Sequence, residues 1–351
     1  MKVINPINAL LGLFSHDVGI DLGTANTLVW VKGKGILIRE PSAVARHKKS
    51  KEILAIGASA KKMLGRAPLT IEAIRPLRDG VIADFDATAA MLTHYIKKVH
   101  ETGSSFPKIP RPRVVIGIPS GVTDVERRAV ADAAVDAGAR EAYLIEEPMA
   151  AAIGANLPIL GPEGNFIVDI GGGTSEIAMI SLGGIVLGRS VRTAGDEMDE
   201  AIINYVRLKY SLLLGQPTAE SVKIGIGSAV SQKDKFFVVR GRDLESGLPK
   251  SIKLTSTEVQ ESLSPIIQEI TNNIVETLEE TPPELVSDIM EKGITLAGGG
   301  SLLPGIDKVI SEATKMPVWV AEDPLTCVVR GCGILLDNPA LLAKVRITKG
   351  L

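Results

Sequence analysis

The stretch that decides the fold is VGIDLGTANTLV, residues 18–29, together with its second version FIVDIGGGTSEI at residues 166–177. In each version an apolar, β-rich run delivers an aspartate, Asp21 or Asp169, and small residues then turn the chain into a second β-rich run. Both versions continue through another glycine turn into a third apolar run. A strand–turn–strand–turn–strand unit is therefore written twice, which predicts two equivalent half-molecules facing each other across a cleft.

The two turns have the composition of a phosphate-binding loop. Glycine and other small residues let backbone N–H groups approach an anion closely, and no lysine is needed. Thr24, Asn26, Thr174 and Ser175 can add hydroxyl or amide donors. The aspartate before each turn can hold Mg²⁺ through water, since magnesium keeps much of its hydration shell. The alternative is a glycine-rich hairpin without a ligand, and the repetition of turn and aspartate together favours the phosphate site.

The composition limits the class of protein. The 351 residues carry 39 Lys+Arg against 41 Asp+Glu, a formal net charge of −2, and only 3% of them are aromatic. This balance offers no basic surface for nucleic acid and few platforms on which single-stranded bases could stack, so no nucleic-acid partner is expected. Hydrophobic residues at 45% exclude disorder for most of the chain.

The sequence lacks the marks of a secreted or membrane-spanning protein. No uncharged stretch reaches the roughly 18 apolar residues that a membrane span needs. The amino-terminal segment does not have the layout of a cleavable signal. The two cysteines, Cys327 and Cys332, are interpreted as reduced core thiols rather than as a metal or redox site. These features predict a cytoplasmic protein.

A carboxylate between the two repeats is a candidate for orienting a water molecule. Residues 123–126 form a capping box that starts a helix ending at Gly138, and residues 143–145 follow as a buried strand. That strand delivers Glu147 to its carboxyl end, where Pro148 opens the next helix. Such a carboxylate can orient a water molecule. By itself the sequence favours the other interpretation, an acid that only stabilises the helix N-terminus.

The second half supplies further candidates. Gly195 begins a helix whose polar start either helps to close the cleft or is a simple N-cap at Asp196, and Thr218 is the expected N-cap of the next helix. On that second helix Glu220 and Lys223 lie on one face, either bracketing a ribose or forming a surface pair, and the surface pair is favoured. Residues 294–297 are predicted to form a buried strand leading into the loop 298–301, which either approaches a flat group such as adenine or is only a tight turn.

With these motifs in place, the chain resembles the MreB family of bacterial actin homologues, within the superfamily of actin, sugar kinases and heat-shock chaperones. The two turns and the 296–300 segment LAGGG fit the superfamily at large. Four longer motifs are more specific to the family, and they are IDLGTANTL at 20–28, IRPLRDGVIADF at 74–85, EEPMAAAIG at 146–154 and RGRDL at 240–244. The resemblance runs from about Asp17 to about Leu336.

The resemblance implies an α/β, actin-like fold with two ribonuclease-H-like domains around a nucleotide cleft, each carrying a small inserted subdomain. The implied division assigns residues 1–45, 79–155 and 323–351 to the first core (IA), with 46–78 inserted as IB. It assigns residues 156–194 and 260–322 to the second core (IIA), with 195–259 inserted as IIB.

The resemblance also implies an ATP site with Mg²⁺ and a role for each matching residue. Asp21 and Asp169 would hold the metal through water, Glu147 would position the attacking water, and Thr174 would assist near the γ-phosphate. The implied nucleotide-binding residues are Asp21, Gly23, Thr24, Ala25 and Asn26 in the first loop, Asp169, Gly171, Gly172 and Gly173 in the second, Glu220 and Lys223 at ribose and base, and Gly298, Gly299, Gly300 and Ser301 at the adenosine.

The implied function is that of a slow ATPase that polymerises into paired protofilaments. These would lie on the inner face of the cytoplasmic membrane and, with membrane proteins of cell-wall elongation, maintain rod shape. A short amino-terminal helix presenting Ile7, Leu10, Leu11 and Phe14 on one face is expected to contact the membrane rather than pack on the body. Phe106 falls where the family carries a second apolar membrane contact.

Two other classes share the superfamily. A small-molecule kinase would need a base beside a sugar-sized acceptor pocket, and the predicted insertions offer no obvious one. A chaperone would need a peptide-binding domain, for which the chain after the last core helix leaves no room. The cytoskeletal interpretation is therefore preferred.

Overall fold

Each of the two repeated segments forms the first strands of a five-stranded sheet. The computed structural model describes residues 15–101, 111–233 and 235–347. Ile7, Leu10, Leu11, Phe14 and Phe106, the predicted membrane contacts, lie outside the described residues. The chain separates into two compact units, the first of Met1–Gly161, Leu182–Ile185 and Thr326–Leu351, and the second of Pro162–Ser181 and Val186–Leu325.

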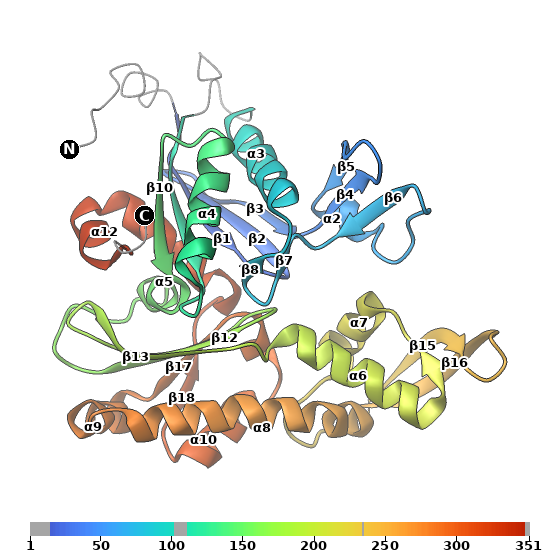
Figure 1. Cartoon of the computed structure of the whole chain (residues 1–351). Helices are drawn as coiled ribbons and strands as arrows, with labels where there is room; N and C mark the ends of the chain where they lie inside the picture. The colour runs from blue at the N-terminus through green and yellow to red at the C-terminus, as the bar shows by residue number, and fades with distance from the viewer. Residues whose placement is uncertain (1–14, 102–110, 234, 348–351) are drawn as a thin grey trace. The chain divides into compact units, whose positions relative to one another are not determined.

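The first unit is built on the sheet β10-β9-β1-β2-β3 (Figure 1). Its strands are β1 (Val18–Leu22), β2 (Asn26–Val31), β3 (Gly35–Pro41), β9 (Arg113–Ile118) and β10 (Glu141–Glu146). The helices of this unit are α3 (Phe85–Glu101), α4 (Asp124–Asp136), α5 (Glu147–Gly154), α11 (Cys327–Asp337) and α12 (Pro339–Val345). The predicted capping box on Thr123 is present at the start of α4.

A smaller sheet, β5-β4-β6, is attached to the first unit. It consists of β4 (Val44–His47), β5 (Ile53–Ile56) and β6 (Ile71–Ile74), with α2 (Ala58–Lys61) beside it and the hairpin β7 (Leu77–Arg78) and β8 (Val81–Ile82) after it.

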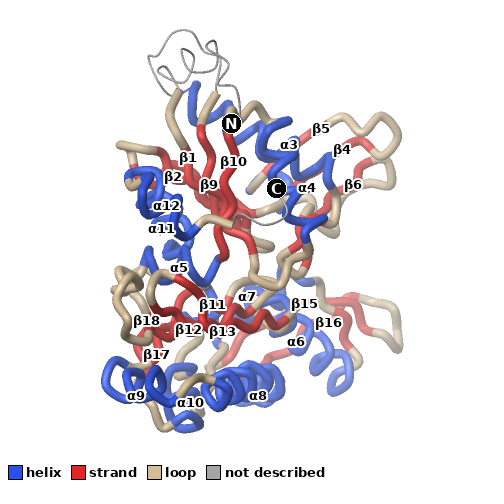
Figure 2. Tube along the Cα trace, turned by 60° about the vertical axis from the view of Figure 1, so that its left-hand side comes forward, coloured by secondary structure: helices blue, strands red, loops and turns tan. Residues whose placement is uncertain are grey.

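The second unit repeats the five-stranded order as β13-β12-β11-β17-β18. Its strands are β11 (Asn165–Ile170), β12 (Ser175–Ser181), β13 (Gly184–Val191), β17 (Ile294–Ala297) and β18 (Val318–Val320). Its helices are α6 (Gly195–Tyr210), α7 (Gln216–Ile226), α8 (Ser256–Glu280), α9 (Pro283–Lys292) and α10 (Ile306–Thr314), with the 3₁₀ turns η1 (Gly299–Leu302) and η2 (Pro324–Thr326). The small sheet β14-β15-β16 comprises β14 (Leu212–Leu213), β15 (Phe236–Asp243) and β16 (Pro249–Thr255). Figure 2 shows α8, α9 and α10 together on one side of the five-stranded sheet.

The duplication predicted from the sequence is confirmed down to the register. Asp21 lies opposite Leu28 in the antiparallel pair β1–β2 and beside Gly117 in the parallel pair β1–β9. Asp169 lies opposite Glu176 in the antiparallel pair β11–β12 and beside Ala297 in the parallel pair β11–β17. The two aspartates therefore occupy the same position in two copies of one sheet.

Alternation along the strands decides which face each aspartate occupies. In β1, Val18, Ile20 and Leu22 are buried in the apolar cluster with α3 and α4. Gly19 lies on the other face, where a methyl group at its Cα would come within 2.9 Å of Cys332 Cβ on α11. Because side chains alternate, Asp21 shares the α11 face with Gly19.

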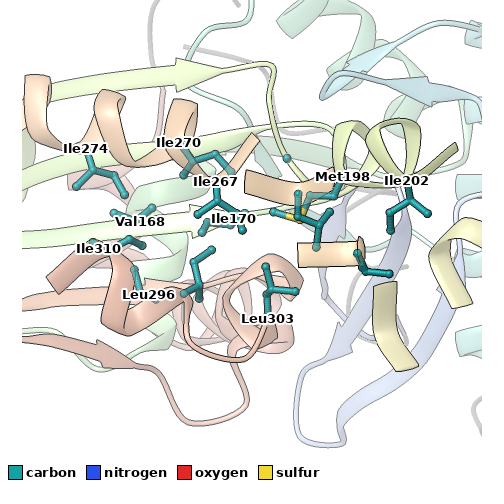
Figure 3. Close-up of a cluster of buried hydrophobic side chains, with 14 of the residues drawn as sticks. Val168, Ile170, Met198, Ile202, Ile267, Ile270, Ile274, Leu296, Leu303 and Ile310 are labelled. Carbon is teal, nitrogen blue, oxygen red and sulfur yellow. The ribbon is translucent and has the colours of Figure 1, made fainter. Parts of the chain in front are cut away.

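The core of the second unit follows the same rule. Figure 3 shows Val168 and Ile170 of β11 meeting side chains of the surrounding elements. The neighbours drawn there include Leu296 of β17, Met198 and Ile202 of α6, Ile267, Ile270 and Ile274 of α8, and Ile310 of α10. Asp169, between Val168 and Ile170, points away from this cluster.

The N-cap predicted at Thr218 is wrong, and Asp196, for which an N-cap was one of two alternatives, is not an N-cap either. Helix α6 has Ala194 as its N-cap, and the Glu197 carboxylate accepts the Ala194 N–H at 2.9 Å, so Asp196 lies inside the first turn. Helix α7 begins at Gln216 with Gly215 as N-cap. Pro217 is compatible with a first helical turn, so the helix starts before Thr218. Within the described residues no single helix is long and apolar enough to cross a membrane.

Candidate nucleotide site

The turn after β1 is held by neighbouring backbone and hydroxyl groups. The Ser42 hydroxyl donates to the Gly23 carbonyl at 2.5 Å, and the Ser42 N–H donates to the Ala25 carbonyl at 3.1 Å. Thr24 is buried, and its hydroxyl accepts the Gly80 N–H at 3.1 Å. The turn shape is therefore fixed by contacts from the segments after β3 and β7, while Asn26 is exposed at the start of β2.

The turn after β11 closes in the same way. The Gly171 N–H donates to the Thr174 carbonyl at 2.8 Å, which leaves Gly172 and Gly173 at the tip. Ser175 was expected to add a hydroxyl donor to the site. Instead it is fully buried, and its hydroxyl donates to the Thr193 carbonyl at 2.7 Å. Ser175, the first residue of β12, therefore attaches that strand to the segment before α6, whereas Thr174 is the last residue of the turn before β12.

Asp21 and Glu147 lie close together in the first unit. Asp21, the penultimate residue of β1, lies beside Gly117 of β9. A methyl group at Gly117 would lie 3.5 Å from Glu147 Cγ and 4.0 Å from Cys332 Sγ. The parallel strands β1, β9 and β10 thus deliver both carboxylates to their carboxyl ends, the usual edge for ligands in such sheets.

Burial governs the chemistry of this cluster. It raises the pKa of Asp21 to about 7. Burial, together with the nearby charges of Asp21 and Glu147, also raises the pKa of the Cys332 thiol. When a cation binds beside such a carboxyl group, the positive charge favours its ionised form. Asp21 can then interact strongly with the cation.

Helix α11 positions Glu147 through small residues that the sequence analysis did not single out. Glu147 is 9% exposed in the first turn of α5. A methyl group at Gly331 of α11 would lie 1.9 Å from the Ala150 carbonyl oxygen, so the α5 and α11 backbones are in direct contact. Cys332 then touches β1, and Gly333 packs on Trp30 of β2. In the sequence, the triplet Gly-Cys-Gly within an apolar helix was the pattern that could have indicated this close packing of helices.

The loop after β17 closes over the second aspartate. Gly298 has a φ of 79°, and a methyl group there would lie 2.3 Å from Asp169 Oδ1. A glycine is therefore required both by conformation and by space. The Ser301 hydroxyl donates to the Gly298 carbonyl at 2.6 Å, so this side chain closes the loop. The predicted strand 294–297 is confirmed as β17.

Lys223 joins the same group of residues in the second unit. Its ammonium donates to the Gly195 carbonyl at 2.6 Å and lies 2.8 Å from Asp199 Oδ1. The favoured surface pair with Glu220 is therefore wrong for Lys223, whose side chain is only 17% exposed. Glu220, half-buried one turn earlier on α7, is close enough to raise the pKa of Asp199.

The predicted residues thus gather in one group within each unit. The first unit brings together Asp21, the turn Gly23 to Asn26, and Glu147. The second brings together Asp169, the turn Gly171 to Thr174, the α7 residues Glu220 and Lys223, and the loop Gly298 to Ser301. Across the described residues, no group of three or more His, Cys, Asp and Glu side chains is arranged to enclose a metal ion.

Two copies of one sheet order, each with an aspartate at the same register position before a small-residue turn, define an actin-like protein. The chain belongs to the MreB/Mbl family, whose family model, described as MreB/Mbl protein, matches residues 15–344. It is 53% identical over 331 residues to the cell shape-determining protein MreB of Escherichia coli strain K12, which covers 93% of this chain and 94% of that protein. It is 47% identical over 337 residues to the cell shape-determining protein Mbl of Bacillus subtilis strain 168, covering 96% and 100%.

Solved structures agree with the fold. MreB5 of Spiroplasma citri bound to ADP superimposes with a TM-score of 0.87 at 40% identity, over 93% of this chain and 97% of that one. The same protein bound to AMPPNP gives the same values. A MamK double helical filament matches with a TM-score of 0.78 at 23% identity, over 92% and 99%, and shows the fold alone.

Proposed function

We propose that this chain binds and hydrolyses ATP and polymerises into membrane-associated filaments that direct cell-wall elongation and maintain rod shape. Its actin-like cytoskeletal role in cell shape follows from membership of the MreB/Mbl family, whose members compared above are named for determining cell shape. The main observation that supports nucleotide binding is that an aspartate followed by a small-residue turn occurs at the same register position in both sheets. Family membership favours this class over a small-molecule kinase or a chaperone-like ATPase.

Nucleotide binding is supported by the relatives as well as by the local geometry. The Spiroplasma citri protein was solved with ADP and with AMPPNP, and it shares 40% of its residues with this chain. The proposed phosphate contacts are the backbone N–H groups of the two turns, Gly23 to Asn26 and Gly171 to Thr174. Gly298 to Ser301 would line the adenosine, and Glu220 and Lys223 are the residues that the family resemblance places at ribose and base.

The residues present fit a magnesium ion held mainly by water and phosphate. Asp21 and Asp169 are the penultimate residues of equivalent strands, and the described residues include no cage of acidic side chains that would replace the hydration shell. When bound, Mg²⁺ would neutralise charge on the phosphate oxygens. Asp21 and Asp169 would then accept hydrogen bonds from its water ligands.

Hydrolysis requires a group that orients the attacking water. Glu147 is proposed for this role because it ends the β10–α5 connection beside Asp21 and is held there by α11. Thr174 is proposed to assist near the γ-phosphate. A carboxylate in this position accepts a hydrogen bond from water and aligns its oxygen for attack.

Filaments and partners extend the proposal beyond the single chain. Self-association into paired protofilaments would place many copies along the inner face of the cytoplasmic membrane, where membrane proteins of wall elongation could dock. The four-subdomain division into IA, IB, IIA and IIB, with the boundaries predicted from the sequence, is part of this proposal.

The test is nucleotide binding by an aspartate variant. Asp169→Ala should weaken binding of the Mg–ATP complex sharply in calorimetry and abolish ATP-dependent pelleting of filaments. Asp307→Ala, an aspartate in the first turn of α10 in the same unit, is the matched control and should behave as the native protein. Native affinity in Asp169→Ala would contradict the assignment of the second turn, and a native protein that binds no ATP would overturn the proposed activity.

A further inference from the structure

Ser228 carries a buried hydroxyl and lies outside the residues proposed to bind the nucleotide. It follows the end of α7 by two residues and is 1% exposed. Its hydroxyl lies 2.7 Å from the Val230 carbonyl oxygen and 3.0 Å from the Pro304 carbonyl oxygen, and it accepts the Val230 N–H at 3.2 Å. A hydroxyl has one proton, so the two carbonyls share it. Ser228 therefore contacts both the segment after α7 and the segment between η1 and α10.

Two further contacts join the same segments. The Ala229 N–H donates to the Pro304 carbonyl at 2.8 Å, so this oxygen receives donors from two neighbouring residues. Gly305 has a φ of 82°, and a methyl group there would lie 2.5 Å from Val230 Cγ2. A glycine is therefore required both by conformation and by space. We call these contacts the clasp, which consists of residues 227–230 and 303–305.

The clasp joins the end of α7 to the end of the loop after β17. The Gly227 N–H donates to the Lys223 carbonyl at 2.9 Å, so the clasp continues the last turn of the helix. A methyl group at Gly227 would lie 3.3 Å from Cδ1 of Leu303, which belongs to the apolar core drawn in Figure 3. The Leu303 N–H donates to the Gly300 carbonyl at 3.0 Å, so the clasp also continues the loop Gly298 to Ser301. The two elements proposed to contact the nucleoside thus meet at the clasp.

The second phosphate turn is supported in a different way. It closes on itself through the bond from the Gly171 N–H to the Thr174 carbonyl, 2.8 Å long. None of the clasp contacts named above involves this turn. A change in the clasp is therefore expected to shift the elements at the nucleoside and to leave the phosphate turn in place.

We infer that Ser228 is a positioning residue for the nucleoside end of the site. By donating to the Pro304 carbonyl it sets the separation between α7, which carries Glu220 and Lys223, and the loop Gly298 to Ser301. It acts through these two elements on the ribose and base. The inference rests on the proposed function, and it assigns to Ser228 an effect on nucleoside affinity that is separate from phosphate hydrolysis.

Amide exchange of the nucleotide-free chain tests the clasp. In Ser228→Ala the Val230 N–H loses its acceptor, so the Ala229 and Val230 amides should exchange about 2- to 10-fold faster, the range for loss of one hydrogen bond. Amides of the α8 interior around Ile270 should keep their protection. Ser221→Ala is the matched control, because this exposed serine of α7 donates to the Pro217 carbonyl at 2.8 Å. Native exchange at Ala229 and Val230 in Ser228→Ala would overturn the inference.

Ligand affinities then test the role of the clasp in nucleoside binding. Affinities for ATP, ADP and adenosine are measured on the full chain, with adenosine followed by ligand-observed NMR. Ser228→Ala should weaken all three by a similar factor, about 2- to 10-fold, and keep the single-turnover hydrolysis rate at saturating ATP within about twofold of native. Ser221→Ala should match the native protein in every measurement. A loss for ATP without a loss for adenosine, or slower hydrolysis at saturation, would overturn the inference.

A second variant opens the clasp from its other side. Gly305→Ala should give the same pattern with a larger loss of affinity, because the added methyl group pushes against Val230. The double variant should lose no more affinity than Gly305→Ala alone, since both changes act on one contact. Native affinity in both single variants of a chain that binds ATP would overturn this inference and leave the proposed function intact. A native chain that binds none of the three ligands would refute both.

Discussion

At the residue scale, the two repeated aspartates are equivalent in position but lie in different surroundings. Asp21 has Gly117, Glu147 and Cys332 around it, and burial alone raises its pKa to about 7. Asp169 is pressed against Gly298, and the loop after β17 closes over it. Ionisation of Asp21 therefore costs folding free energy.

The substitution Asp21→Asn should make the nucleotide-free protein more stable at alkaline pH. Asp21 has a higher pKa in the folded chain, about 7, than its ordinary value of 3.8, so the native protein loses stability as pH rises from about 4 to 7. The advantage of the amide should grow by about 2 kcal/mol between pH 5.5 and pH 8.5 and become flat at higher pH. Urea unfolding at the two pH values measures the difference. An advantage that shrinks toward pH 8.5 would show that the Asp21 carboxylate is stabilised in the fold.

The same variant should lose affinity for the Mg–ATP complex, because an amide is a poorer acceptor for a magnesium-bound water than a carboxylate. A gain in stability together with a loss of ligand binding is the expected pattern for a residue that serves ligand binding at a cost in folding stability.

The substitution Glu147→Ala should slow phosphate release by about 10²- to 10⁴-fold, the usual effect of losing a positioned base. Nucleotide binding should survive, since Glu147 is not proposed to hold the phosphates. Single-turnover hydrolysis measures the rate, and Glu146→Ala, at the adjacent position on β10, is the control that should retain activity. Normal hydrolysis by Glu147→Ala would mean that Glu147 only stabilises the N-terminus of α5 and has no catalytic role.

At the element scale, α11 determines where α5 and the strand ends lie. Three consecutive residues of α11 contact three different elements: Gly331 touches α5, Cys332 touches β1, and Gly333 touches Trp30 of β2. None of these residues is proposed to touch the nucleotide. Their small size brings the helix backbones together, and the position of Glu147 depends on that approach.

The substitution Gly331→Ala should therefore damage both stability and hydrolysis. The added methyl group would lie 1.9 Å from the Ala150 carbonyl oxygen, so the α5 and α11 backbones must separate. Overpacking of this kind costs roughly 1–3 kcal/mol or more. Thermal unfolding and ATP turnover measure the two effects. Gly215→Ala, where the methyl group meets nothing closer than 3.8 Å, is the control. A Gly331→Ala protein with native turnover would separate α11 packing from catalysis.

At the scale of the whole molecule, one architectural unit is used twice. The sheets β10-β9-β1-β2-β3 and β13-β12-β11-β17-β18 share their order and the register of their aspartates. Each unit has its own apolar core, and each contributes one turn to the proposed nucleotide chemistry. Filament formation multiplies any weak contact that a single chain makes, because many copies then act together.

Deletion of residues 1–14 should strongly reduce co-sedimentation with liposomes and leave ATP-dependent assembly in solution intact. Burying one apolar side chain of this size is worth roughly 1.5–3 kcal/mol, so the proposed contact of Ile7, Leu10, Leu11 and Phe14 with the membrane would be weak in one chain and stable in a filament. Phe106→Ser is the parallel variant, measured in the same pelleting assay. If the deletion binds liposomes at full strength and Phe106→Ser does not, the segment around Phe106 is the anchor instead.

The sequence by itself determined the duplicated strands, the two aspartates, the strand before Gly298 and the family, because turn chemistry and strand periodicity are local properties of the chain. It was wrong about the Ser175 hydroxyl, about the cap at Thr218, and about the partner of Lys223. The outcomes for Ser175 and Lys223 depend on residues far apart in sequence, Thr193 for Ser175 and Gly195 for Lys223. The cap at Thr218 was lost to a local cause, since Gly215 and Pro217 start the helix earlier. Only the tertiary structure decided that Lys223 pairs with Asp199 and that the small residues of α11 bring α5 and the strand ends close together. Close backbone approach and buried ion pairs arise from packing between elements and leave no periodic signal in the sequence.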